Sequence, residues 1–447
     1  MIDYQTFLDR KTQLGSDGGF DPTFLPDFLF PFQRALVEWA TIKGRAAIFA
    51  DCGLGKTPMQ LVWAQNVVEK LNKPVLILTP LSVGPQTVRE AEKFNIEAEQ
   101  SRDGSAPGKI TVTNYQQLHK FDWQEFGGVV CDESSILKNF DGALRKGITD
   151  FMRKVPYRLL CTATAAPNDH VELGTSSEAL GDLRRVEMLA QFFNHDGGET
   201  SKWRIKKHAA KHAFWRWVCS WARAVKHPRD LGFDQPGFEL PKLTTIEHVI
   251  KSTTVNPDFL FDMPAVGLQE QRAERKRTIN ERCDQAAKLV SDHTGPSVSW
   301  CHLNTEGDML QKLIPDCVQV AGRDPDDAKI EKIEAFVSGE VKNMITKPSV
   351  CGFGLNWQHC AHQTFFPSHS FEQWYQSIRR SWRFGQNQDV TIDVISSEGE
   401  SGVTGNLNRK AALADLMFGK LIANMNSEIK TAKQINHTEK QEQPSWL

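Results

Sequence analysis

A glycine-rich turn with a lysine and a threonine follows an apolar run near the start of the chain. The stretch reads AAIFADCGLGKTPMQ over residues 46–60. Gly53 and Gly55 let backbone N–H groups turn toward anionic oxygens, because no Cβ stands in the way. Lys56 supplies a cation for the β- and γ-phosphates, and the Thr57 hydroxyl supplies a ligand for Mg²⁺. The order of residues therefore predicts a loop that holds the phosphates of a nucleotide.

An acidic pair closes another apolar run, in VVCDESSILKN at residues 129–139. Asp132 is the residue type that holds Mg²⁺ through water, and Glu133 the type that polarises an attacking water. A strand-ending Asp-Glu pair by itself is also typical of a solvated turn. Together with the phosphate loop upstream, the pair predicts hydrolysis of a nucleoside triphosphate.

Short apolar runs alternate with helix-like stretches, which predicts an α/β fold with parallel sheets covered on both faces. The runs of the first half are 46–51, 74–80, 110–115, 127–133 and 158–164. Those of the second half are 297–303, 317–322, 342–347, 363–368 and 389–395. Residues 57–71, between the first two runs, carry a broad apolar helical face. We therefore expect an N-terminal nucleotide-binding domain, a helical basic insert and linker, a C-terminal domain and a polar, frayed tail, at residues 1–180, 181–255, 256–425 and 426–447.

The charge, the cysteine content and the hydropathy of the chain further limit its possible functions. The net charge of the 447-residue chain is −2, so binding to a polyanion must come from local patches. Its nine cysteines form no C-x-x-C pair, which argues against a zinc knuckle and a disulfide framework. No signal-peptide pattern and no apolar stretch of about 20 residues is found in the sequence. We expect a cytoplasmic protein.

Seven segments, in chain order from about residue 29 to 395, resemble the motifs of superfamily 2 nucleic-acid-dependent ATPases of the Swi/Snf-type branch. They are LFPFQRALVEWA (29–40), LILTPLSV (76–83), VTNYQQL (112–118), DESSILKN (132–139), LLCTATAAPN (159–168), CGFGLNWQHC (351–360) and QSIRRSWRFGQ (376–386). The resemblance implies two RecA-like domains with a cleft for ATP and Mg²⁺ between them. The chain also departs from the family, since Ser134 and Ser135 replace the common Ala-His.

The same resemblance implies roles for individual residues. Gln33 is implied as the reader of adenine, and Gly354 as a contact to both nucleotide and nucleic-acid backbone. Thr79 and Pro80 end a strand whose counterpart touches the backbone. The residues implied to face the ATP cleft are Gln376, Arg380 and Arg383. The two arginines would stabilise the charge that spreads over the γ-phosphoryl oxygens during transfer.

Residues 201–229 contain nine Lys/Arg, no Asp/Glu, and four tryptophans, Trp203, Trp215, Trp217 and Trp221. Interleaved cations and aromatic rings are typical of a surface that follows a nucleic-acid backbone and stacks on bases. The candidate contacts are Lys206, Lys207 and Lys211. The helical spacing of four apolar residues in this segment also predicts a face packed in the core. These four are Phe214, Trp217, Val218 and Trp221. We expect both, with the apolar face inward and the basic face outward.

The narrower resemblance is to compact helicase-like proteins of bacteriophages and prophages. It implies a DNA-dependent ATPase that moves along DNA, with duplex DNA as the favoured track, in phage or prophage DNA metabolism of a bacterial host cell. A phage replication or recombination protein is then the partner to look for. Two alternatives stay open. One is a strand-separating DNA or RNA helicase, and the other is an ATP-driven switch or loader that remodels a protein partner on DNA.

Overall fold

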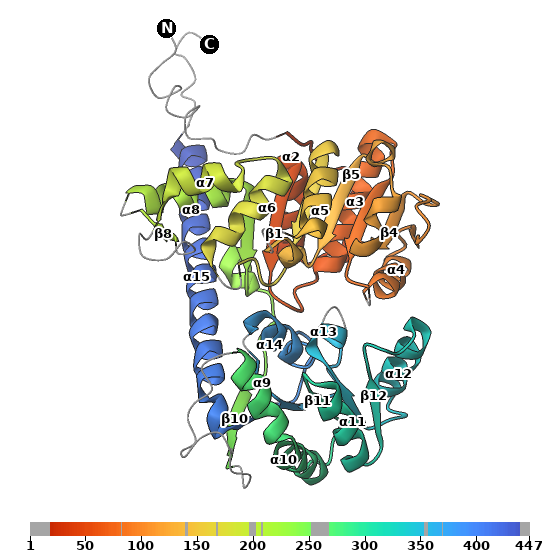
Figure 1. The fold of residues 1–447 in the computed structure, drawn as a ribbon. Helices are drawn as coiled ribbons and strands as arrows, with labels where there is room; N and C mark the ends of the chain where they lie inside the picture. Colours follow the sequence, from red (N-terminus) through yellow and green to blue (C-terminus); the bar gives the residue numbers. More distant parts are fainter. Residues whose placement is uncertain are drawn as a thin grey trace, which may run out of the picture. The chain divides into compact units, whose positions relative to one another are not determined.

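The computed structural model divides the chain into two compact units, each with its own parallel sheet (Figure 1). Unit 1 comprises residues 1–235 and 414–447, and unit 2 comprises residues 236–413. The structure describes residues 18–438 except 82, 139–141, 167–168, 196–202, 207–208, 252–267, 353–355 and 369.

Unit 1 contains a parallel sheet of seven strands in the order β3-β4-β2-β5-β6-β1-β9. Their bounds are β1 (Arg45–Ala50), β2 (Val75–Thr79), β3 (Ala98–Gln100), β4 (Ile110–Asn114), β5 (Gly128–Asp132), β6 (Tyr157–Cys161) and β9 (Ala222–Val225). Every residue of β2, β4 and β5 is buried, as in a parallel sheet with helices on both faces. The helices are α2 (Pro31–Lys43), α3 (Lys56–Leu71), α4 (Gly84–Lys93), α5 (Ala143–Lys154), α6 (Leu173–Leu180), α7 (Arg185–Phe192) and α8 (Ala209–Trp221).

Unit 2 contains a parallel sheet of six strands in the order β10-β15-β14-β11-β13-β12. The strands are β10 (Leu243–Ile250), β11 (Ser297–Trp300), β12 (Cys317–Val320), β13 (Asn343–Thr346), β14 (His362–Phe365) and β15 (Val390–Ser397). The helices are α9 (Leu268–Arg277), α10 (Ile279–Asp292), α11 (Asn304–Leu313), α12 (Asp326–Ser338), α13 (Pro348–Cys351) and α14 (Phe371–Ile378). The predicted α/β fold with parallel sheets is confirmed, and each of the ten predicted runs overlaps a strand.

The segment expected as a separate insert, 181–255, contributes to both sheets. Its strand β9 pairs with β1, so that Val225 lies opposite Ala50, and its strand β10 pairs along its whole length with β15. The segment also forms a small antiparallel ribbon of β7 (Phe193–His195) and β8 (Trp203–Ile205). The units accordingly divide the chain near 235 and 413, rather than at the expected boundaries of 180, 255 and 425.

Helix α15 (Ser401–Thr438) includes the first part of the expected frayed tail, whose backbone is helical up to Thr438. From residue 414 onward this helix belongs to unit 1. Its buried side chains Met417, Phe418, Leu421 and Met425 join the apolar cluster that contains α8. A salt bridge between Lys226 and Asp415 and a contact from the Cys219 thiol to the Leu421 carbonyl support this packing.

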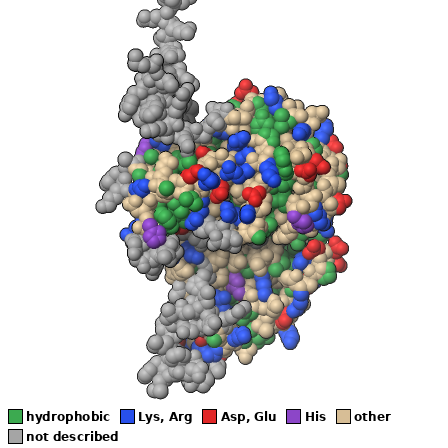
Figure 2. All heavy atoms as spheres, turned by 45° about the horizontal axis from the view of Figure 1, so that its top comes forward, with side chains coloured by type: hydrophobic (Ala, Val, Ile, Leu, Met, Phe, Trp, Pro, Cys, Tyr) green, Lys and Arg blue, Asp and Glu red, His purple; other side chains and the backbone are tan. Residues whose placement is uncertain are grey.

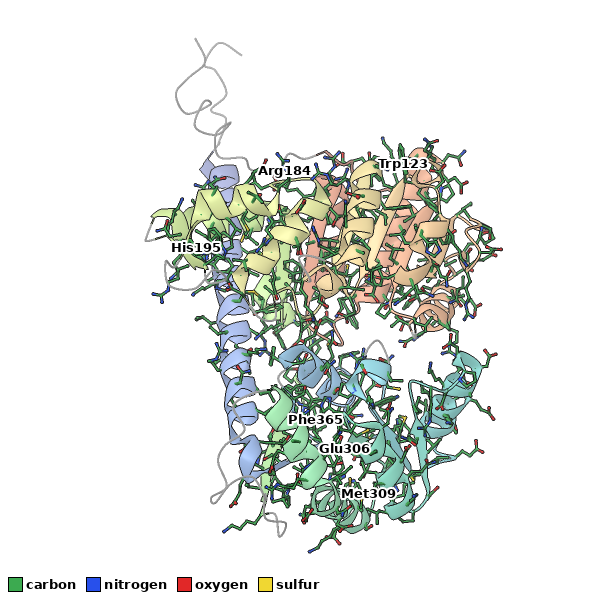
Figure 3. The ribbon with its side chains drawn as sticks, viewed as in Figure 1. Trp123, Arg184, His195, Glu306, Met309 and Phe365 are labelled. Atoms are coloured by element: carbon green, nitrogen blue, oxygen red, sulfur yellow. The ribbon has the colours of Figure 1, made fainter. Side chains whose placement is uncertain are left out.

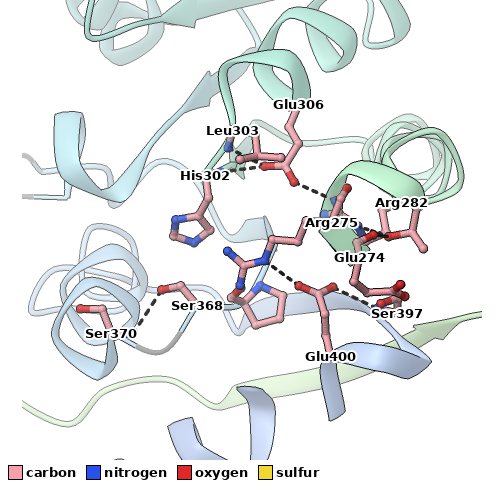
Figure 4. A network of polar contacts seen from close by, with 12 residues as sticks. Glu274, Arg275, Arg282, His302, Leu303, Glu306, Ser368, Ser370, Ser397 and Glu400 are labelled. Carbon is pink, nitrogen blue, oxygen red and sulfur yellow. Dashed lines mark hydrogen bonds and ion pairs between the residues drawn. The ribbon is translucent and has the colours of Figure 1, made fainter. Parts of the chain in front are cut away.

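An ion-pair network fixes the first helices of unit 2 to the ends of its strands (Figure 4). Arg282 Nη2 lies 2.8 Å from Glu306 Oε1, and both side chains are fully buried. Glu306 also accepts hydrogen bonds from the backbone N–H groups of His302 and Leu303. Arg275 bonds Glu400 at 2.7 Å and the Pro367 carbonyl at 2.6 Å. Pairing of the buried charges offsets part of the cost of their burial, although Arg282 Nη1 has no hydrogen-bond partner among the described residues.

Among the described residues, no helix combines the length and the apolar character needed to cross a bilayer.

Candidate functional site

The phosphate-loop candidate connects the carboxyl end of β1 to the first residue of α3. Gly53 has φ 87° and Gly55 has φ 75°, a left-handed conformation that favours glycine. A Cβ on Gly55 would lie 2.2 Å from Gln33 Nε2, so a larger residue there would displace the Gln33 amide from its hydrogen bond to the loop. The loop thus has the strand–turn–helix context that phosphate binding requires.

Lys56 is held over its own loop. Its Nζ donates to the carbonyl of Ala50 at 3.0 Å and to that of Asp51 at 3.4 Å. Thr57 is half-buried in the first turn of α3, and Pro58 is the third residue of that helix. The first turn of a helix has N–H groups without intrahelical partners, and its positive end attracts anions. The donor set therefore fits a triphosphate with Mg²⁺, with Lys56 and the glycine loop on the phosphates and Thr57 on the ion.

Gln33 joins α2 to the phosphate loop. Its Oε1 accepts from the Phe30 N–H at 3.0 Å, and its Nε2 donates to the Leu54 carbonyl at 2.9 Å. The side chain is buried, with 4 % of the residue exposed. The structure thus gives Gln33 a role in holding the loop, next to the implied role of reading adenine.

Asp132, the last residue of β5, is buried and accepts a hydrogen bond from Gln60 Nε2 at 2.7 Å. Burial and the neighbouring Glu133 raise the pKa of the Asp132 carboxyl to about 6, against the lowering effects of Gln60 and Lys56. Sequence reasoning missed Gln60. The spacing of four residues from Lys56 could have identified Gln60, because residues four apart on a helix lie on one face.

Glu133 has φ 52°, an uncommon conformation for a residue with a side chain. Its Oε2 accepts from the Thr162 hydroxyl at 3.1 Å. The Tyr115 hydroxyl donates to the backbone carbonyl of Asp132 and so fixes the end of β5. Thr162 was not singled out from the sequence, although it directly follows β6, the neighbour of β5. Strained backbone held by such contacts is typical of functional sites.

The arginine candidates lie after α14 in unit 2. Arg380 is buried at 2 % exposure, and its Nε donates to the Gln376 carbonyl at 2.8 Å. Arg383 is half-buried. Gln376 is fully buried, yet its Oε1 and Nε2 have no hydrogen-bond partner among the residues that the structure describes. An unsatisfied buried amide is costly, so it marks this turn as a candidate binding region. Gly354 lies outside the described residues.

The candidate residues for nucleic-acid contact differ in their solvent exposure and in their hydrogen bonds within the protein. Thr79 is fully buried, and its hydroxyl contacts the Thr113 carbonyl at 3.4 Å, whereas Pro80 is half-buried. Lys206 Nζ donates to the carbonyls of Ala190 and Gln191 at the end of α7. Lys211 is exposed, and Lys207 lies outside the described residues.

The prediction of a two-faced helix at α8 is confirmed for its apolar side. The side chains of Phe214, Trp217, Val218 and Trp221 are buried in the core of unit 1. Trp215 is buried as well, so these three tryptophans are not available to stack on bases. Trp203 is half-buried. The exposed side chains of α8 include Lys211, His212 and Arg216, of which His212 and Arg216 lie opposite the buried residues.

No model of a known protein family matches the chain. It is 29 % identical over 180 residues to the mouse protein "DNA annealing helicase and endonuclease ZRANB3", an alignment that covers 35 % of this chain and 17 % of the mouse protein. It is 28 % identical over 201 residues to the Xenopus tropicalis protein "SWI/SNF-related matrix-associated actin-dependent regulator of chromatin subfamily A-like protein 1", over 42 % of this chain and 20 % of the relative. The chain thus spans about a fifth of the length of these relatives.

A solved structure, the "Sulfolobus solfataricus SWI2/SNF2 ATPase core in complex with dsDNA", aligns with 91 % of this chain and 96 % of its own. The sequence identity is 17 %, and the TM-score is 0.43.

Proposed function

We propose that this protein is a DNA-dependent ATPase of the Swi/Snf type, which couples ATP hydrolysis to movement along DNA. The observation that carries the proposal is the joint placement of a lysine-bearing phosphate loop and a buried Asp-Glu pair in one parallel sheet. The loop follows β1 and the pair ends β5, with only β6 between the two strands. The carboxyl ends of parallel strands lie at one edge of a sheet, where open α/β proteins bind ligands.

We assign the chemistry to residues as follows. Lys56 and the loop N–H groups bind the phosphates, and Thr57 and Asp132 hold Mg²⁺, which neutralises phosphate charge when bound. Glu133 orients the attacking water, and its contact with Thr162 keeps the carboxylate in place. Arg380 and Arg383 are the candidates for stabilising the charge that develops on the γ-phosphoryl oxygens.

The proposal that the protein moves along DNA rests on the names of the relatives and on the exposed basic residues of α8. Duplex DNA is the proposed track because the motifs of the chain resemble those of the Swi/Snf-type branch, whose members move along duplexes. The phage or prophage setting in a bacterial cytoplasm, with a replication or recombination protein as partner, rests on sequence resemblance alone.

The test is a comparison of ATPase rates with duplex DNA, single-stranded DNA and RNA, at several lengths of each. We expect duplex DNA to stimulate most and longer duplexes more than short ones, because a moving motor dissociates less often per turnover on a long track. Lys56→Ala should abolish turnover, and Arg383→Ala should lower kcat while ATP still binds. Normal turnover of Lys56→Ala would refute the phosphate-loop assignment. Equal stimulation at all lengths would favour a switch or loader, and stronger stimulation by RNA would refute the DNA track.

A further inference from the structure

A hollow opens at the edge of the unit 1 sheet that lies away from the phosphate loop. Its volume is about 270 Å³, and its lining is Leu71, Lys73, Trp123, Gln124, Phe126, Lys154 and Pro156. These residues precede β2, β5 and β6, so they lie at the amino ends of the strands, whereas the phosphate loop follows a carboxyl end. Figure 3 labels Trp123 at the top of unit 1. Figure 2 turns this top forward and shows Lys and Arg side chains interspersed with hydrophobic ones.

The floor of the hollow is part of the folded core. Phe126 is buried, and its ring lies 6.1 Å from that of Phe121 and 6.3 Å from that of Phe151. The wall of the hollow is closely packed, since a Cβ added to Gly127 would lie 2.9 Å from Leu71 Cδ1. The apolar surface is therefore preformed, and an incoming side chain would meet it without rearrangement of the core.

Two exposed lysines stand on the rim. Lys73 Nζ contacts the Gln124 carbonyl at 3.3 Å, and Lys154 Nζ lies 5.7 Å from the centroid of the Trp123 ring. Neither lysine forms an ion pair with an acidic residue anywhere in the described part of the chain. The hollow thus combines an apolar floor with two lysines that form no ion pair with the described residues.

We propose that this hollow docks an acidic segment of a protein partner, with one aromatic or leucine side chain in the hollow and carboxylates on Lys73 and Lys154. The partner segment should be acidic because the two lysines on the rim are positively charged. It should insert a single apolar side chain because the hollow is small and its floor is apolar. The proposal goes beyond the ATPase function and does not depend on it.

A nucleic-acid strand fits this surface less well. Lys154 lies over the Trp123 ring, where a stacking base would have to displace it. The exposed Asp122 and Glu125 flank Trp123 in the same turn. A strand carries a phosphate at every nucleotide and would bring charges against these acids, whereas a peptide places its carboxylates beside the lysines alone.

Occupation of the hollow leaves the phosphate loop accessible. Strands of five residues span about 17 Å between the two edges of the sheet. A partner bound at the amino-end edge can therefore remain attached throughout ATP turnover.

The test uses the full chain and a fluorescein-labelled peptide with a central tryptophan and two aspartates on each side. We expect saturable binding in fluorescence anisotropy, and about tenfold weaker binding in the double variant Lys73→Glu/Lys154→Glu, because two attractive rim contacts become repulsive. The matched control is Lys109→Glu/Lys146→Glu. It makes the same charge change at two exposed lysines, one before β4 at the same edge of the sheet and one on α5. The control should bind the peptide as the wild type does, and basal ATPase should be unchanged in both variants.

A second measurement locates the peptide. Replacing its tryptophan with benzoylphenylalanine should give photo-crosslinks to the segments around Leu71, Trp123 and Pro156, and replacing it with alanine should abolish binding. The proposal is overturned if the peptide does not bind, if both double variants bind it equally, or if crosslinks form only elsewhere. It is also overturned if a single-stranded oligonucleotide, rather than the peptide, loses affinity through the Lys73/Lys154 change.

Discussion

Gln60 Nε2 lies 2.7 Å from Asp132 Oδ1, so the helix that begins with the candidate phosphate lysine also holds the candidate magnesium carboxylate. Helix α3 thereby links the candidate phosphate loop, which follows β1, to the candidate magnesium ligand at the end of β5. The hydrogen bond favours the ionised form of Asp132, and burial opposes it.

Gln60→Leu removes this donor at nearly constant volume. The pKa of Asp132 should rise further above about 6, so a higher pH is needed to ionise the carboxylate that we propose as a Mg²⁺ ligand. We expect the pH of half-maximal ATPase activity, at limiting Mg²⁺, to increase by about one unit. Gln65→Leu on the same helix, where the side chain bonds Glu69, is the matched control. An unchanged pH midpoint in Gln60→Leu would show that the hydrogen bond does not tune the site.

Asp132→Asn should stabilise the fold while it abolishes ATPase activity. The folded-state pKa of about 6 exceeds the ordinary value near 3.8, so the folded protein holds the proton more tightly than the unfolded chain. Stability is therefore lost as the pH rises from about 4 to 6, by an amount of the order of 3 kcal/mol. Asparagine should remove this loss. Urea unfolding of the Mg²⁺-free protein at pH 5 and pH 7.5 tests it, with the exposed Asp150→Asn as control. A destabilised Asp132→Asn variant at pH 7.5 would contradict the expectation.

Two glycine substitutions should have opposite effects. Gly55→Ala places a Cβ against Gln33 at φ 75°, so we expect weaker nucleotide binding and a loss of stability of about 1–3 kcal/mol. Gly147→Ala introduces a methyl group into α5 where nothing lies within 4 Å, and should stabilise the helix by about 1 kcal/mol. Thermal unfolding and nucleotide titration measure both effects. Equal behaviour of the two variants would mean that the loop is not conformationally restricted.

The basic face of α8 can be separated from the structural lysine beside it. Lys211→Gln together with Arg216→Gln should lessen the salt dependence of DNA binding, with a change in slope of about 0.9 for each DNA phosphate that is no longer neutralised. Lys206→Gln should instead lower the melting temperature, because its ammonium group bonds two carbonyls at the end of α7. The readouts are DNA affinity between 50 and 200 mM salt, a range over which such slopes are resolved, and the unfolding temperature. A salt slope unchanged by the double substitution would exclude this face from DNA binding.

Much of the fold could be predicted from the sequence because the strands of buried parallel sheets are short apolar runs. Strand β5 illustrates this, since all five residues are buried and four of them are Gly, Val or Cys. Strand β9 escaped prediction because ARAV is short and lies at the end of a basic helical segment. Strand β10 escaped because its exposed face gives it a mixed polar pattern.

The candidate site could be outlined from the sequence where its residues are adjacent, as in the loop from Gly53 to Thr57. It was not predictable where the contact joins distant segments. Gln60 and Asp132 are 72 residues apart, and Glu133 and Thr162 are 29 apart, so only the fold brings them together. The burial of Thr79 likewise depends on neighbours that the motif itself does not contain.

The return of α15 to unit 1 has a consequence for synthesis on the ribosome. The core of the candidate ATP-binding unit includes Met417, Phe418, Leu421 and Met425, and the ribosome adds these residues after all of unit 2. A nascent chain that has already displayed its phosphate loop therefore still lacks part of the surface that covers α8. Unit 1 can finish folding only after α15 has been synthesised, so shorter products are left with an open apolar surface, which is a target for chaperones and proteases.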